Sequence, residues 1–221
     1  MPVVDTDFNV LHSIVRLAAV TDADTLVDLG CGDGAVLVYT ARHTGARCVG
    51  FDIRRSCIDN TRHAAEHAGL SHRIDGHEHN FFDQEGLDAH PAYARASVVY
   101  AYLLPEVVRT LEPLLRRAVD DGKVVLLYCS TGCRIRKSTD RPAGNVIADL
   151  QPAGTALMGK LRLYCSAETL SRRSEMRAAC APRTQQLQQV CGARHPTGST
   201  SLPTLRLPPW LPSIGMVAAV T

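Results

Sequence analysis

The sequence predicts an α/β fold in which helices cover both faces of a mostly parallel sheet. Short β-rich runs alternate with helical patterns, two of these runs are continuously apolar as in buried parallel strands, and a glycine-rich loop follows the first run. The chain has 221 residues, which suits one domain of ordinary size with an appended tail. The predicted architecture is a Rossmann-like three-layer α/β/α sandwich, with an antiparallel strand at one edge of the sheet.

Each predicted helix and strand rests on a pattern of its own. In order they are a helix over residues 9–20, a strand over 25–29, a helix ending near 44, a strand over 47–51, a helix over 56–68, a weak strand within 71–79, a strand over 97–101, a helix over 105–119, and strands over 123–128 and 160–165. Asp7 is a candidate N-cap of the first helix, and Pro105 suits the first turn of its helix. Ser56 and Asp59 have the spacing of a capping box.

The last quarter of the chain differs from the rest in composition. Residues 168–221 hold two acids and six bases, a net charge of +4, whereas residues 1–167 hold 20 acids and 18 bases. Six of the twelve prolines lie in this last part. A short helix over Glu168–Cys180 is compatible with the sequence, and beyond it we predict a poorly ordered extension. We therefore predict a domain over residues 1–167 and a Pro/Gln/Ser-rich basic tail over 168–221.

Composition excludes several classes of protein. The formal charge of +2 gives no electrostatic indication of a nucleic-acid partner. No apolar run approaches the ~20 residues that span a bilayer, and the opening residues 1–7 are acidic, unlike a secretory signal. We predict an intracellular, cytoplasmic chain without a membrane span. The eight cysteines are dispersed without a CxxC, which favours reduced thiols, and the nine histidines show no converging set of ligands, so we predict no metal site.

The segment most informative about function is Val27–Gly34, with the sequence VDLGCGDG. A tight strand-to-helix turn would explain the glycines alone, but Asp28 stands at a strand end where an unpaired carboxylate is costly to bury. Asp52 ends the next strand, where a carboxylate suits a pair of ribose hydroxyls. Acidic residues on both sides of the loop would repel the diphosphate of a nicotinamide cofactor and attract the sulfonium and ammonium of S-adenosylmethionine. The charges therefore favour S-adenosylmethionine, with a nicotinamide oxidoreductase as a remote alternative.

VDLGCGDG followed by GFD resembles motif I and its downstream acid in class I S-adenosylmethionine-dependent methyltransferases. The resemblance implies the following cofactor-binding residues: Asp28, Gly30, Cys31, Gly32, Gly34, Asp52, Ile53, Asn80 and Phe81. It implies that Asp28 lies near the amino acid portion, that Asp52 binds the ribose hydroxyls, and that Asn80 faces the adenine. Core packing is the alternative for Phe81.

A second segment narrows the family. The sequence VYAYLLPEV of Val99–Val107, with the hydrophobic helix near the start, is similar to small seven-β-strand methyltransferases. These include the mitochondrial lysine methyltransferases of the ATP synthase c-subunit and the adenine nucleotide translocase, and the resemblance covers roughly residues 5–165. It implies an enzyme (EC 2.1.1.-) with a protein lysine as acceptor. By resemblance alone it also allows a mitochondrial location, although the hydrophobic targeting segment usual in the eukaryotic enzymes is missing from this sequence.

The residues after the fourth strand face the methyl group in this architecture. We therefore expect Tyr102 to position the acceptor amine, with Leu103 and Leu104 as the wall of its channel and Glu106 as a second candidate to orient the amine. Tyr102 could instead merely cover the sheet edge, and Glu106 could merely complement the helix dipole. The predicted function is protein-lysine N-methylation. The alternatives are methylation of a small molecule, or a catalytically silent binding module with the same fold.

Overall fold

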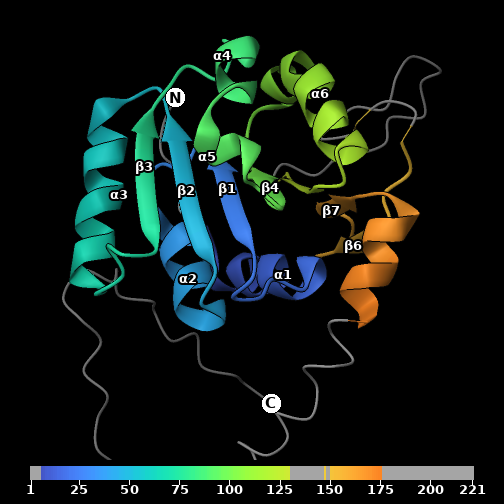
Figure 1. The fold of residues 1–221 in the computed structure, drawn as a ribbon, viewed down its shortest axis with the longest axis horizontal. Coiled ribbons are helices and arrows are strands. Elements are labelled where there is room, and N and C mark those ends of the chain that lie inside the picture. Colours follow the sequence, from blue (N-terminus) through green and yellow to red (C-terminus); the bar gives the residue numbers. More distant parts are fainter. Residues whose placement is uncertain (1–5, 130–146, 148–149, 176–221) are drawn as a thin grey trace, which may run out of the picture. The chain divides into compact units, whose positions relative to one another are not determined.

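The computed structural model describes residues 6–129, 147 and 150–175, and in them seven strands form one sheet. The strands are β1 (Thr25–Leu29), β2 (Arg47–Asp52), β3 (Ile74–Glu78), β4 (Val98–Ala101), β5 (Val124–Tyr128), β6 (Gly154–Ala156) and β7 (Leu161–Tyr164). Their order is β3-β2-β1-β4-β5-β7-β6; β1 to β5 run parallel, while β7 is antiparallel to β5 and to β6 (Figure 1). The predicted fold class is confirmed.

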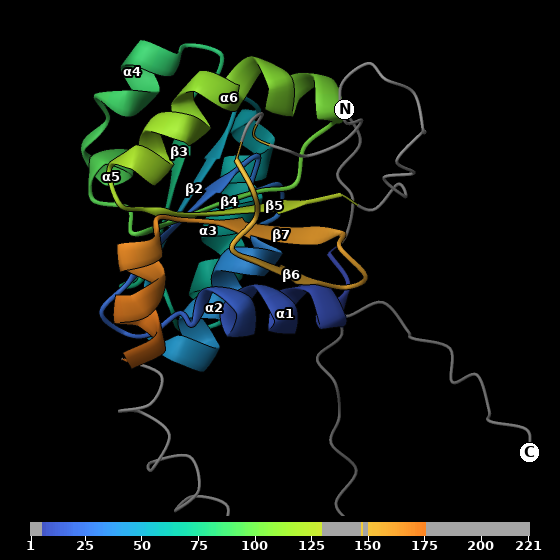
Figure 2. The ribbon, with the colours of Figure 1, turned by 90° about the vertical axis from the view of Figure 1, so that its right-hand side faces the viewer.

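Helices cover both faces of this sheet. They are α1 (Phe8–Ala18), α2 (Ala35–Thr44), α3 (Arg55–His67), α4 (Gln84–Asp88), α5 (Pro91–Ala94) and α6 (Pro105–Asp120). Helices α1 to α3 lie on one side and α4 to α6 on the other (Figure 2). Because successive strand residues point to opposite faces, β1 contributes Leu26 to the core on the α1–α3 side and Val27 and Leu29 to the core on the other side.

The helix ends show which local patterns the fold uses. Asp7 caps α1, its side chain accepting a hydrogen bond from Asn9 N at 2.7 Å, and Pro105 is in the first turn of α6, both as predicted. The capping box at Ser56 and Asp59 is wrong. Helix α3 begins one residue earlier, its N-cap is Arg54 without a side-chain cap, and the Asp59 carboxylate accepts from Arg55 Nε at 3.3 Å.

Three short elements have no counterpart in the sequence prediction: α4, α5 and β6. Side chains cap the N-termini of α4 and α5: the Asp83 carboxylate accepts from Gly86 N at 3.1 Å, and His90 Nδ1 accepts from Ala92 N at 3.2 Å. Five, four and three residues are too short to carry a helical or alternating period. They arise from local caps and from pairing with β7.

Residues 167–175 are helical, within the region where a short helix was expected. Arg173 ties this helix to the sheet domain: its Nη2 lies 2.7 Å from Asp24 Oδ1, and its Nη1 donates to Ala18 O at 2.8 Å. Both side chains of the ion pair are largely buried. The poorly ordered extension concerns residues outside the described part, and the division of the chain at residue 167 stays a prediction. No helix within the described residues is long and apolar enough to cross a membrane.

Candidate functional site

The glycine loop leaves β1 and enters α2 through three residues with left-handed backbone. Gly30, Gly32 and Gly34 have φ of 86°, 57° and 82°. A Cβ on Gly30 would lie 2.8 Å from Leu103 Cδ2, and a Cβ on Gly34 would lie 3.0 Å from two side-chain atoms of Thr61. Both the backbone conformation and the close neighbours therefore require glycine here.

Neighbouring elements hold this loop in place. Phe51 O, at the end of β2, accepts from Gly30 N at 2.7 Å and from Cys31 N at 3.2 Å. Thr61 is fully buried on α3 and donates its hydroxyl hydrogen to Gly32 O at 3.2 Å. Thr61 was not among the residues predicted from the sequence. The available indication was a single hydroxyl within the otherwise apolar buried stripe of α3.

Asp52 lies against the loop at the carboxyl end of β2. Its side chain is buried, and Oδ2 accepts from Gly32 N at 3.2 Å while Oδ1 accepts from Arg54 N at 2.9 Å. Two backbone N–H groups thus fix the carboxylate. The structure brings Asp52 and the glycine loop together at one edge of the sheet.

Asp28 is the other acid at this edge of the sheet, and its hydrogen bonding differs from that of Asp52. It is 3% exposed, and within the described residues no group donates a hydrogen bond to its carboxyl. Burial, reinforced by the nearby charges of Asp52 and Asp33, raises the pKa of Asp28 from 3.8 to about 8. An unpaired buried carboxyl beside a glycine loop is a site that a positively charged ligand would complete.

The residues predicted to lie near the adenine differ from the two acids in their exposure and contacts. Asn80 is exposed and its Oδ1 accepts from Phe82 N at 3.1 Å, so its side chain closes its own turn. Phe81 is buried in the core on the α4–α6 side. Ile53 directly follows Asp52 and is 56% exposed.

On the other side of the loop, the segment after β4 carries the predicted acceptor residues. Tyr102 is half-buried, Leu103 is buried against the loop, and Leu104 is 52% exposed at the start of α6. Glu106 is exposed and pairs with Arg109 at 3.3 Å, so this carboxylate serves its own helix in the structure.

A second tyrosine, absent from the sequence prediction, stands beside Tyr102. Ala101 pairs with Leu127 in the parallel register of β4 and β5, so the residues that follow, Tyr102 and Tyr128, are neighbours. Their rings meet edge to face with centroids 4.8 Å apart. The available indication was the tyrosine at the end of each of two strands predicted to be buried. The two rings form a small aromatic wall at the carboxyl ends of the strands.

Comparison with known proteins identifies this arrangement. Residues 28–129, a little under half of the chain, match the family model of the ANTKMT methyltransferase domain. The chain contains a class I S-adenosylmethionine-dependent methyltransferase domain. The matched residues of this methyltransferase domain begin at Asp28 and run past the end of β5, so they include the loop, Asp52 and both tyrosines. The resemblance stated from the sequence motifs is confirmed.

Individual relatives agree with this assignment. A protein-lysine N-methyltransferase of Saccharolobus islandicus is 28% identical over 129 residues, which cover 58% of this chain and 76% of that protein. Methyltransferase phqN of Penicillium fellutanum is 32% identical over 123 residues, covering 53% of this chain and 38% of that protein. An RNA methyltransferase from Salinibacter ruber, solved with S-adenosyl-L-homocysteine, gives a TM-score of 0.57 at 27% identity and covers 73% of this chain and 91% of that one. The methyltransferase fold is thus one that binds S-adenosylmethionine.

The residues of this domain fit the cofactor chemically. The glycine loop offers a surface without side chains, and the unpaired Asp28 offers a buried carboxyl group that a sulfonium or an ammonium would favour in its ionised form. Among the described residues, no group of three or more His, Cys, Asp or Glu side chains is arranged to hold a metal ion.

Proposed function

We propose that the chain transfers a methyl group from S-adenosylmethionine to a lysine amine of a protein. The observation that carries the proposal is the pairing of Tyr102 and Tyr128 next to the candidate cofactor loop. Leu29 pairs with Ala101 in the register of β1 and β4, so Tyr102 follows its strand beside Gly30. The Saccharolobus relative is named as a protein-lysine N-methyltransferase, which supports the same acceptor.

In this proposal the glycine loop and the two strand-end acids hold the cofactor. Asp28 faces the amino acid portion, Asp52 accepts from the ribose hydroxyls, and the loop from Gly30 to Gly34 lies along both. Cys31, Ile53, Asn80 and Phe81 complete the candidate set. When bound, S-adenosylmethionine supplies an activated methyl group, so the chain's own task is to align the acceptor, a contribution of up to ~7–11 kcal/mol.

The acceptor lysine has to reach the site as a neutral amine. Its long apolar stem can lie along Leu103 and Leu104, while the amine end lies against the rings of Tyr102 and Tyr128. Burial raises the pKa of Tyr128, so this phenol stays neutral at physiological pH. A partly desolvated aromatic wall favours deprotonation of an arriving ammonium, which is what a nucleophilic amine requires.

The direct test is to incubate the purified chain with methyl-labelled S-adenosylmethionine and a cell extract. We expect label in protein that survives ribonuclease, is removed by protease, and elutes as methyl-lysine after acid hydrolysis. Label that disappears with ribonuclease would favour an RNA acceptor, as the name of the Salinibacter enzyme suggests for that protein. Label only in small molecules would favour the alternative predicted from the sequence. The absence of nucleic-acid partners and an intracellular location also remain predictions.

Replacing Asp52 with alanine should weaken S-adenosylmethionine binding by about 10–100-fold, because a charge-assisted bidentate contact is lost. Isothermal titration calorimetry measures the effect. Asp59→Ala is the matched control, since Asp59 is a half-buried acid that pairs with arginines on α3. If Asp52→Ala binds as tightly as the control, Asp52 does not contact the ribose.

Replacing Tyr102 with alanine should lower kcat on the protein acceptor by about 10–100-fold and leave cofactor affinity unchanged, because the tyrosine aligns the amine and not the donor. Tyr102→Phe keeps the ring and should retain most of the activity. Steady-state methylation at saturating donor separates the two variants. Equal activity of Tyr102→Ala and the parent chain would show that this ring only covers the sheet edge.

A further inference from the structure

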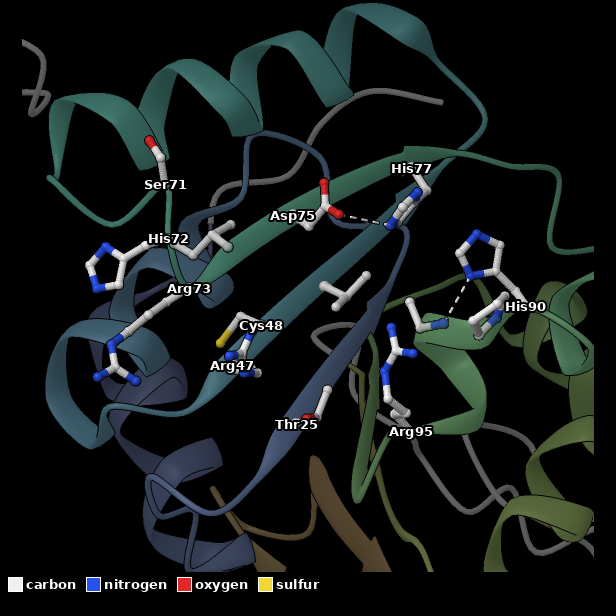
Figure 3. A pocket seen from close by; sticks show the side chains of 14 residues that line it. Thr25, Arg47, Cys48, Ser71, His72, Arg73, Asp75, His77, His90 and Arg95 are labelled. Carbon is white, nitrogen blue, oxygen red and sulfur yellow. Dashed lines mark hydrogen bonds and ion pairs between the residues drawn. The ribbon is translucent and has the colours of Figure 1, made fainter.

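A groove of about 870 Å³ lies away from the glycine loop, on the sheet face beside α5 (Figure 3). It runs over the first residue of β1, the first half of β2 and most of β3, as far as His77, and is closed on one side by the residues of α5 and its ends. On β2, Arg47 opens the groove, whereas Asp52 of the candidate cofactor site is five residues further on. At about 3.3 Å per strand residue the two are roughly 16 Å apart. The arginine end of the groove is therefore distant from the methyl-transfer site, while its His77 end reaches the level of Phe51 on β2.

The lining of this groove is strongly basic. Its charged and titratable residues are Arg47, Arg73, Arg95, His72, His77, His90 and a single acid, Asp75. The acid is already engaged, because Asp75 Oδ2 lies 3.2 Å from His77 Nε2. This single carboxylate faces three guanidinium groups in the groove.

The two arginines that flank the groove are available to a ligand. Arg47 on β2 and Arg95 after α5 are exposed, and neither side chain has a hydrogen bond or ion pair with another residue in the part of the chain that the structure describes. Arg73 is partly committed, since it donates to Gly45 O. Figure 3 shows Arg47 and Arg95 coming from different elements of the lining. Two guanidinium groups in one concave surface, each able to donate two parallel hydrogen bonds, suit a ligand that carries several anionic groups.

The kind of anion follows from what the lining lacks. Single-stranded nucleic acid is held by arginines together with large aromatic rings on which bases stack. Among the lining residues there is no Phe, Tyr or Trp, and the histidine rings are partly used: His77 stacks on Phe51 and His90 caps α5. Clustered arginines without stacking platforms are typical of sites for acidic or phosphorylated polypeptides.

We propose that this groove binds an acidic segment of a polypeptide, whose carboxylates or phosphates pair with Arg47 and Arg95. Its role as a docking site for the methylated protein rests on the proposed function: a substrate held here could present a lysine at the carboxyl ends of the strands, roughly 16 Å away. About five residues of extended chain cover that distance. Docking at two points would raise the local concentration of the lysine at the active end.

The experiment measures fluorescence anisotropy of labelled ten-residue peptides with the full chain at low salt. One peptide is glutamate-rich, one carries phosphoserines, and a labelled RNA oligonucleotide is the third probe. We expect at least one peptide to bind, and the double variant Arg47→Ala/Arg95→Ala to weaken that binding by tenfold or more. Arg172→Ala is the matched control, an exposed arginine outside the groove, and should bind like the parent chain. The stronger of the two peptides identifies carboxylate or phosphate as the preferred group.

Three results would overturn the proposal: no binding of either peptide, equal loss in Arg172→Ala and the double variant, or binding of RNA without binding of peptide. Calorimetry with S-adenosylmethionine on the same samples keeps this proposal separate from the proposed function. If the chain binds S-adenosylmethionine and methylates protein lysine but binds neither peptide, the proposed function is supported and the docking groove is contradicted. If the chain binds peptide through the two arginines but methylates no protein, the peptide-binding groove is supported and the proposed function is contradicted.

Discussion

Gly32→Val is expected to abolish measurable binding of S-adenosylmethionine, which means a loss of more than 100-fold. Gly32 has φ of 57°, a region that a β-branched residue occupies only at a cost of about 1–3 kcal/mol. Its N–H also donates to Asp52 Oδ2 at 3.2 Å, so any shift of the loop at this point moves the acid proposed to bind the ribose. The valine side chain would in addition project from the bare surface on which the cofactor is proposed to lie. Calorimetric titration of the folded variant measures the loss.

The control for this experiment is Gly69→Ala. Gly69 also has left-handed backbone, with φ of 69°, but a Cβ there meets no atom within 4 Å. Gly69→Ala therefore carries the backbone cost without the obstruction and should bind the cofactor normally. Thermal unfolding establishes that both variants fold, and Gly32→Ala supplies a smaller side chain if the valine variant does not. A folded Gly32→Val that binds like Gly69→Ala would remove the loop from the cofactor site.

The parts of the fold that the sequence predicts well are those whose periodic pattern and packing agree. The boundaries of β1 were predicted to the residue, because a short β-rich run ends there at a glycine loop, and four of its five residues, Asp28 included, are buried. Helix α6 carries a long amphipathic stripe behind a proline. The start of α3 was misjudged, because Asp59, three residues after Ser56, pairs with Arg55 instead of capping the helix, and only the structure distinguishes these two roles.

In the candidate site, too, some residues could be predicted from the sequence and others could not. The glycine loop follows β1, and the two acids lie on β1 and β2, which are adjacent parallel strands. Because the carboxyl ends of parallel strands meet at one edge of the sheet, the topology alone predicts that the loop and the acids lie close together. Thr61 and Tyr128 come from elements distant in sequence and have no motif of their own. The groove lined by Arg47 and Arg95 was not foreseen either, since a net charge of +2 averages a local basic surface against acids elsewhere.

Asp28→Asn is expected to stabilise the ligand-free chain at high pH. Because the folded-state pKa of Asp28 is about 8 and its ordinary value is 3.8, the folded chain binds a proton in this interval that the unfolded chain has lost. Stability of the parent chain therefore falls as the pH rises from about 4 to about 8, by up to ~1.4 kcal/mol per pH unit, and then levels off. An amide imitates the protonated acid and removes this loss. Urea unfolding at pH 5 and pH 9 should show the variant gaining on the parent chain by several kcal/mol at the higher pH.

The same substitution should act in the opposite direction on cofactor binding. A cationic ligand requires the ionised Asp28, so in the parent chain binding releases the proton, and the affinity advantage over Asp28→Asn should grow by up to tenfold per pH unit between pH 6 and pH 8. Titration of the ligand's own amino group affects both chains alike and cancels in the ratio. Calorimetry across this range measures the ratio directly. A ratio independent of pH, found together with the expected gain in stability, would mean that Asp28 is buried beside the loop without facing the positive charge of the methyl donor.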